Sequence, residues 1–120
     1  MRRTNVGRIV TGFASLALAL ATLACSDDGT GPADDNPPAA ITITMNDNTF
    51  SPQVDTVAVN GTVTWTNQGQ SAHTTTSEDG DWDSQAVDPG ESYDHQFTTA
   101  GTYAYECTFH PGMTGTIVVR

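Results

Sequence analysis

From residue 41 to residue 120, apolar side chains recur at every second position. Ile41, Ile43 and Met45 alternate with threonines, and Val63 and Trp65 repeat the pattern. Such alternation is typical of β-strands with one buried face, because successive side chains on a strand point to opposite sides. No segment carries the three- and four-residue apolar spacing of a helix. This part of the chain therefore folds from strands, and Met45 belongs to their buried face.

Turn residues cut this segment into short pieces, at Asn60-Gly61, Asp88-Pro89-Gly90 and Ala100-Gly101. Further alternating positions follow them, at Tyr93, His95, Phe97, Tyr103, Tyr105 and Ile117 to Val119. A polar strand is expected at Ala72 to Ser77. Many short strands with frequent turn signals favour an all-β sandwich.

The N-terminus reads as an export signal. Arg2, Arg3 and Arg8 precede an apolar stretch from Ile9 to Ala24 that is rich in Ala and Leu. A basic start followed by a short apolar run is typical of a signal peptide, and the run is short for a transmembrane helix. We therefore assign residues 1–24 to a signal peptide.

Leu23-Ala24-Cys25 resembles the lipobox of bacterial lipoproteins, in which the Cys becomes the lipid-bearing N-terminus. We expect lipidation of Cys25; the alternative is ordinary signal cleavage nearby. Residues 25–40 are acidic and Pro-rich and carry no large apolar side chain. Such a segment buries too little surface to offset its ordering entropy, so we expect a disordered tether and a folded domain at 41–120.

The exported part of the chain is strongly acidic. Counted from Cys25, it holds fourteen acidic residues against Arg120 alone, a net charge of −13. This excludes nucleic-acid binding, which needs basic side chains, and a P-loop enzyme, which needs a Lys. With Cys25 lipidated, Cys107 is the one thiol left, which excludes a disulfide scaffold. The charge would either steer a basic partner or keep the protein soluble in a salty habitat.

Four side chains suggest a metal site. Cys107, His110 and Met113 are spaced three apart after a predicted strand, in a segment interrupted by Pro111-Gly112. A tight loop would let them converge, and sandwich pairing can bring His73 beside them. A trigonal site of two His and one Cys with a weak axial Met is the geometry of blue-copper electron carriers. Zinc is a rival for these ligands, but copper binds more tightly and structural zinc sites usually carry more Cys.

The sequence resembles the cupredoxins of the plastocyanin and amicyanin type. The resemblance rests on Tyr103, Tyr105, Cys107, His110, Pro111, Met113 and Gly115, on Val63-Thr64-Trp65-Thr66-Asn67 followed by His73, and on Asp83-Ser84 with Pro89-Gly90. It covers about Ile41 to Arg120. It implies a Greek-key sandwich of about eight strands with one type 1 copper, held by His73, Cys107, His110 and axial Met113.

The resemblance also implies residues around the ligands. Asn67 matches the family Asn whose backbone N–H bonds the thiolate and whose side chain braces the ligand loop. The chain departs from the family at Ala72, where Pro is usual, and at Thr74, which is often Asn.

The implied function is one-electron transfer, without enzyme activity. The family places the electron exit at the second loop His, here His110, with Phe109, Pro111 and Gly112 as candidates for the apolar docking patch around it. A charge of −13 would suit a basic redox partner such as a cytochrome c or an oxidase subunit. We expect a monomer outside the cytoplasm, in the periplasm or at the cell surface, held to a membrane through Cys25.

Three other functions remain open. The first is a copper-storage or delivery protein, although a buried thiolate site argues against ready release. The second is a multicopper or nitrite-reductase type enzyme, which needs more His than the three in this chain. The third is a lipid-anchored adhesion module without metal, which would have no use for Cys, His and Met at this spacing.

Residues outside this site have simpler explanations. The alternation points His95 inward, so a hydrogen-bonded core or sheet-end His is favoured over a second metal ligand. Trp82 is expected to pack over the end of the sheet. The acidic run around it, Asp79, Asp81 and Asp83, is expected to be a solvated loop; a calcium site is the alternative, but the EF-hand order is missing.

Overall fold

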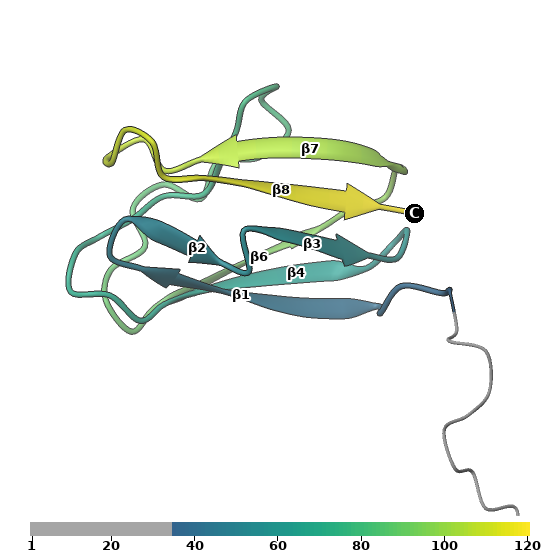
Figure 1. The fold of residues 1–120 in the computed structure, drawn as a ribbon, viewed down its shortest axis with the longest axis horizontal. Coiled ribbons are helices and arrows are strands. Elements are labelled where there is room, and N and C mark those ends of the chain that lie inside the picture. The colour runs from purple at the N-terminus through teal and green to yellow at the C-terminus, as the bar shows by residue number, and fades with distance from the viewer. Residues whose placement is uncertain (1–34) are drawn as a thin grey trace, which may run out of the picture. The chain divides into compact units, whose positions relative to one another are not determined.

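The computed structural model describes residues 35–120, which form eight β-strands (Figure 1). The strands are β1 (Ala40–Asn46), β2 (Thr49–Ser51), β3 (Val54–Val57), β4 (Thr62–Asn67), β5 (Thr76–Ser77), β6 (Ser92–Gln96), β7 (Gly101–Glu106) and β8 (Thr114–Val119). Within these residues no helix is long and apolar enough to cross a membrane. The predicted signal peptide, Cys25 and the predicted tether up to residue 34 lie outside the described residues.

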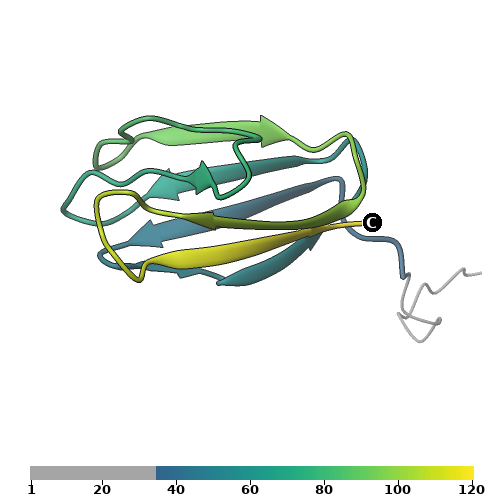
Figure 2. The same ribbon diagram turned by 90° about the horizontal axis from the view of Figure 1, so that it is seen from above.

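The strands form two four-stranded sheets packed face to face. One sheet has the order β2-β1-β4-β6 and the other has the order β3-β8-β7-β5. β1 is parallel to β4 and β3 is parallel to β8, while the other neighbours are antiparallel. Figure 2 shows the long strands of both layers running in similar directions, as in an aligned β-sandwich. The predicted all-β sandwich is confirmed.

The predicted alternation sets the core. Ile43 and Met45 on β1 and Val63 and Trp65 on β4 are fully buried between the sheets. Thr42 and Thr44 point to the other side of β1 and are less buried. Met45 is therefore a core residue, as the alternation predicts.

An aromatic cluster fills the space between the sheets beside β6. Trp82, from the segment between β5 and β6, is 5% exposed and stacks on Trp65 with ring centroids 5.7 Å apart. It also contacts the ring of Tyr105 at 5.9 Å. Trp82 is therefore buried between the sheets, deeper than the predicted position over the end of the sheet.

The predicted polar strand at Ala72 to Ser77 is wrong over most of its length. Regular pairing is limited to β5, and His73 makes an isolated bridge with Val87. The physical reason is burial: His73, Thr74 and Thr75 are three successive buried residues. A regular strand with one solvent face would expose every second side chain, so this segment leaves the strand geometry.

Gly115 on β8 allows the buried Tyr105 to pack closely. A Cβ atom at Gly115 would lie 2.8 Å from Tyr105 Cε1, and the ring is held from all sides by the core. We expect Gly115→Ala to lower the free energy of unfolding by about 1–3 kcal/mol through overpacking. Urea denaturation measures this. The matched control is Gly101→Ala, where the nearest atom would be 3.6 Å away; equal midpoints for both variants would contradict the packing argument.

Candidate metal centre

A short loop between β7 and β8 carries three of the four predicted ligands. Cys107 directly follows β7 and Met113 directly precedes β8, so antiparallel pairing of the strands closes the loop. The N–H of Cys107 donates to the carbonyl of Met113 at 2.9 Å, and the N–H of Met113 donates to the carbonyl of His110 at 3.1 Å. Gly112 has a φ of 87°, which a residue without Cβ adopts readily. This tight turn brings the side chains of Cys107 and His110, which are spaced three residues apart, close together.

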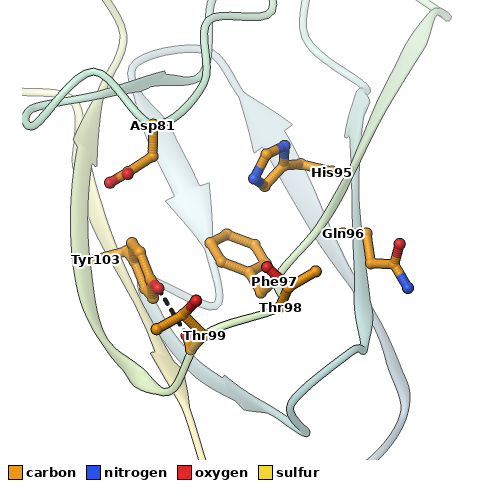
Figure 3. Close-up of a pocket in the computed structure, with 7 residues that line it drawn as sticks. All are labelled: Asp81, His95, Gln96, Phe97, Thr98, Thr99 and Tyr103. Carbon is orange, nitrogen blue, oxygen red and sulfur yellow. Dashed lines mark hydrogen bonds between the residues drawn. The ribbon is translucent and has the colours of Figure 1, made fainter.

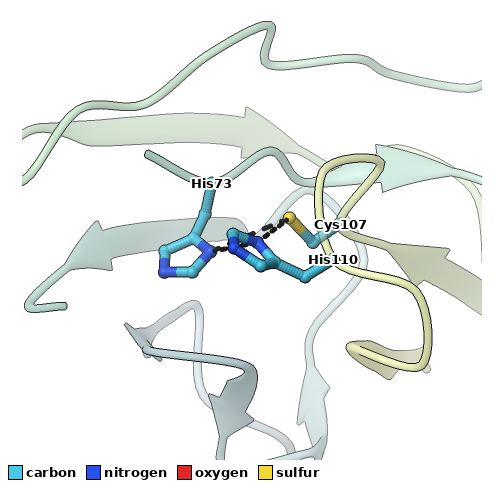
Figure 4. Close-up of side chains that lie close together, drawn as sticks. All are labelled: His73, Cys107 and His110. Carbon is cyan, nitrogen blue, oxygen red and sulfur yellow. Dashed lines mark hydrogen bonds between the residues drawn. The ribbon is translucent and has the colours of Figure 1, made fainter. Parts of the chain in front are cut away.

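His73, from the segment between β4 and β5, lies beside Cys107 and His110 of this loop (Figure 4). Its Nδ1 atom lies 3.8 Å from Cys107 Sγ and 3.1 Å from His110 Nδ1. His110 Nδ1 lies 3.4 Å from Cys107 Sγ. Among the described residues, these three form the one group of His, Cys, Asp or Glu side chains whose ligand atoms converge closely enough to hold a metal ion.

The convergence point is shielded from water on the side of His73 and Cys107. His73 is 0% exposed and Cys107 is 2% exposed, whereas His110 is half-buried. Burial lowers the pKa of His73 below its ordinary value, and the neighbouring His110 lowers it further. The imidazole is therefore neutral at pH 7, which is the form that binds a metal.

These three atoms fit a bound metal ion. His73 Nδ1 and His110 Nδ1 face each other at 3.1 Å. Only one of them can carry a proton and donate it to the other, and if neither does, their two lone pairs repel each other. A cation placed among them would satisfy both nitrogens and the thiolate at once. One thiolate and two imidazoles form a donor set suited to copper, with zinc as the rival.

Met113 lies at the far end of the loop and is 2% exposed. It packs with the buried core residues at this end of the sandwich. The loop hydrogen bonds to Cys107 and His110 fix its backbone beside both ligands. Its position in the loop is consistent with the predicted axial role, which remains a prediction.

Asn67 does not play the part that the resemblance implies for its backbone. Its N–H donates to the carbonyl of Glu91 at 2.9 Å, so the predicted bond to the thiolate is wrong. Asn67 is the last residue of β4, and the pairing there directs its N–H across to the segment before β6. Its side chain donates to the carbonyls of Ser71 and Val87, at 2.8 and 2.9 Å. It therefore braces the segment that leads into His73, not the loop between β7 and β8.

Thr74 supplies the contact to the thiolate instead. Its N–H donates to Cys107 Sγ at 3.4 Å. Its hydroxyl oxygen accepts the N–H of Thr108 at 2.9 Å and lies 3.2 Å from the Thr108 hydroxyl. The residue where the family often has Asn thus ties the His73 segment to the Cys107 loop. Its place directly after a predicted ligand was the one sequence signal for this role.

The residues of the predicted docking patch flank His110 in the chain and are exposed. Phe109 is 51% exposed, and Pro111 and Gly112 are also exposed. An exposed Phe beside a partly exposed imidazole gives this end of the molecule an apolar surface close to the convergence point. The role of this surface as a docking patch remains a prediction.

His95 lies outside the site. It lines a pocket of about 240 Å³ together with Asp81, Phe97 and Tyr103 (Figure 3). Its ring stacks on Trp82 with centroids 5.2 Å apart and meets Phe97 edge-on at 4.8 Å. Burial lowers the pKa of His95. Among the described residues, packing against the rings of Trp82 and Phe97 explains the position of His95, in place of the expected hydrogen bonding.

The acidic run before β6 does not assemble a second metal group within residues 35–120. Asp83 accepts hydrogen bonds from Gln85 and Thr76, and Asp81 accepts one from Ser77. These exposed carboxylates therefore bond to their own loop and to the neighbouring strand β5, as expected for a solvated segment.

Comparisons with known proteins agree with this geometry. Residues 13–119 match the family described as Cupredoxin-like domain. The sequence is 37% identical over 84 residues to a plastocyanin from Scenedesmus fuscus, covering 59% of this chain and 86% of the relative.

Solved structures show the same likeness. A purple cupredoxin from Nitrosopumilus maritimus has a TM-score of 0.62 and 30% identity, covering 66% of this chain and 98% of that one. An amicyanin variant in its reduced Cu(I) form has a TM-score of 0.62 and 30% identity, covering 72% and 87%. A copper-containing nitrite reductase from Thermus scotoductus has a TM-score of 0.62 and 28% identity, covering 77% of this chain but 24% of that one.

The Thr74 hydroxyl gives a prediction about the stability of this loop. Thr74→Val keeps the side-chain shape but leaves the N–H of Thr108 without its acceptor. We expect the metal-free protein to lose about 0.5–1.5 kcal/mol of unfolding free energy, the net contribution of one hydrogen bond, because this bond is part-buried and Thr108 is exposed. Urea denaturation checks this. Thr64→Val, on the outward face of β4, is the control and is expected to stay within about 0.5 kcal/mol of the wild type; a similar loss there would refute the specific role.

Proposed function

Since this chain belongs to the family of cupredoxin-like domains, we propose that it is a type 1 copper protein that carries single electrons between redox partners. His73, Cys107 and His110 would hold the copper, with Met113 as the axial ligand. When bound, copper would supply a centre that alternates between Cu(II) and Cu(I). The observation that carries the proposal is the convergence of two imidazole nitrogens and one thiolate sulfur within 3.8 Å of one another.

The surrounding residues would keep the ligands in place during electron transfer. The thiolate accepts the N–H of Thr74, and the Thr74 hydroxyl fixes the start of the ligand loop. Asn67 holds the segment before His73. A site that is held rigidly in this way rearranges little when one electron is gained or lost, which favours fast transfer.

His110 would be the point of electron exchange. It is the one of the three converging side chains that is partly exposed, and Phe109 beside it is 51% exposed. A small apolar surface suits short-lived docking, since redox encounters use interfaces at the low end of the size range. With Pro111 and Gly112 this surface would receive the partner, and a free patch favours a monomer.

We favour an electron carrier over an enzyme. The nitrite reductase shows that a chain of this fold can be part of a copper enzyme, but this chain spans about a quarter of that protein's length. Further copper centres need further His ligands. His95 is the third His of the chain, and it packs on aromatic rings away from the site.

Copper storage or delivery is less well supported, because a buried thiolate between two fixed imidazoles disfavours quick release. A metal-free adhesion module leaves the convergence of these side chains unexplained.

The proposal also extends to location: the N-terminal sequence supports export to the periplasm or cell surface, with Cys25 as a lipid anchor.

Copper loading gives a direct spectroscopic prediction. With Cu(II), we expect an intense sulfur-to-copper charge-transfer band in the visible region and a narrow copper hyperfine splitting by EPR. Cys107→Ser should abolish the band, because it removes the sulfur. The control Met45→Leu changes a buried Met outside the ligand loop and should keep it. An ordinary weak Cu(II) spectrum that Cys107→Ser leaves unchanged would overturn the proposal.

The net charge of −13, counted from Cys25 onward, gives a prediction about the partner. If the charge steers a basic cytochrome c, the bimolecular reduction rate should fall roughly tenfold or more as ionic strength rises from about 0.01 M to 0.3 M. Stopped-flow measurement checks this. An anionic small-molecule reductant is the control, and its rate should rise with salt. A salt-independent rate with the cytochrome would favour the view that acidity serves solubility alone.

A further inference from the structure

A carboxylate from another part of the chain lies behind the ring of His73. Asp47 follows β1, and β1 pairs in parallel with β4 so that Met45 lies opposite Asn67. Parallel neighbours end at the same edge of a sheet, so the segments after both strands emerge together. Asp47 therefore lies beside Gly69, on the path from β4 to His73.

The Asp47 carboxylate is fixed in this position. Its Oδ1 atom accepts the backbone N–H of Gln70 at 2.8 Å and that of Ser71 at 3.2 Å. These bonds also lower the pKa of Asp47, the bond from Gln70 most strongly, so the side chain is ionised at neutral pH. The carboxylate thus binds the segment just before His73 and presents a fixed negative charge there.

Gly69 keeps the space for this carboxylate open. A Cβ atom built on Gly69 would overlap Asp47 Oδ1 and would lie 3.1 Å from Asp47 Cγ. The N–H of Gly69 donates to the side-chain oxygen of Asn67 at 2.9 Å. Asn67 at the end of β4 and Asp47 just after β1 therefore both hold the segment before His73.

The same carboxylate oxygen faces the far nitrogen of His73. His73 Nε2 is buried and has no hydrogen-bond partner among the described residues, and Asp47 Oδ1 lies 3.5 Å from it. The other ring nitrogen, Nδ1, faces Cys107 and His110. The ring thus lies between a fixed negative charge on one side and the convergence point on the other.

We propose that Asp47 is a positioning residue for His73, accepting the proton of Nε2 in a hydrogen bond so that Nδ1 stays free to bind the metal. The inference rests on the proposed role of His73 as a ligand. Hydrogen bonds from ligating imidazoles to carboxylates fix the ring and raise its basicity. The negative charge also favours Cu(II) over Cu(I), so Asp47 lowers the reduction potential.

The test is Asp47→Asn, which keeps an oxygen for the two backbone N–H groups and removes the charge. We expect the affinity for Cu(II) to fall about tenfold or more, with a smaller loss for Cu(I). Each tenfold difference between the two losses raises the potential by about 59 mV. Asp94→Asn is the matched control, because it removes one exposed carboxylate from the outward face of β6. Equal shifts for both variants would reduce the effect to net charge and overturn the proposal.

Two further measurements separate positioning from folding. Gly69→Ala should displace the carboxylate without removing its charge, and it should shift the potential in the same direction as Asp47→Asn. In the reduced protein, NMR should show His73 Nε2–H exchanging slowly with water in the wild type and at least tenfold faster in Asp47→Ala, which removes the accepting oxygen that Asp47→Asn keeps. An unchanged exchange rate would refute the hydrogen bond.

The outcomes also separate this inference from the proposed function. If the wild-type protein lacks the sulfur-to-copper band, the proposed function fails. If the band is present, Asp47→Asn shifts the potential no more than Asp94→Asn, and Asp47→Ala leaves the exchange rate unchanged, the role of Asp47 alone fails.

Discussion

The structure depends on bringing three ligand atoms from two distant stretches of chain to one buried place. The pairing of β7 with β8 closes the loop that carries Cys107 and His110, and it sets their mutual position. His73 arrives from the segment after β4, which belongs to the other sheet. Thr74 joins the two stretches through its N–H and its hydroxyl. The packing of two sheets against each other is therefore what makes a single site possible.

Surrounding residues supply partners for the polar groups that are buried at this site. A buried thiolate and a buried imidazole need hydrogen-bond partners or a metal, because unpaired polar groups are costly in the interior. The Thr74 N–H faces the sulfur, and the Asp47 carboxylate faces the far side of the His73 ring. The aromatic packing of Trp65, Trp82 and Tyr105 makes the interior behind these groups rigid. Trp82 Nε1–H donates to the Thr75 hydroxyl at 3.0 Å, which links this aromatic packing to the segment that carries His73 and Thr74.

The site is asymmetric, and this asymmetry matches its proposed use. Cys107 and His73 are enclosed, whereas His110 reaches the surface beside the exposed Phe109. An enclosed inner side would shield a bound metal from water and from exchange, and an exposed imidazole edge would shorten the distance to a partner. The acidic side chains of the chain would act at longer range, before contact.

Much of this could be read from the sequence, because it depends on local patterns. The two-residue alternation predicted the buried faces of β1 and β4, and the spacing of Cys107, His110 and Met113 predicted a ligand loop. The sequence did not predict the irregular path from Ala72 to Thr75, because three successive buried residues arise only where both sides are covered by other parts of the fold. The resemblance to the cupredoxins implied a thiolate contact for Asn67, although the pairing around β4 directs that N–H to Glu91. Asp47 carries no local signal, since it lies far from His73 along the chain, and the parallel register of β1 with β4 brings the two together. The sequence by itself determined the strands and the donor set; the tertiary structure decided which residues hold those donors, because hydrogen-bond partners across a sandwich are set by sheet register and not by distance along the chain.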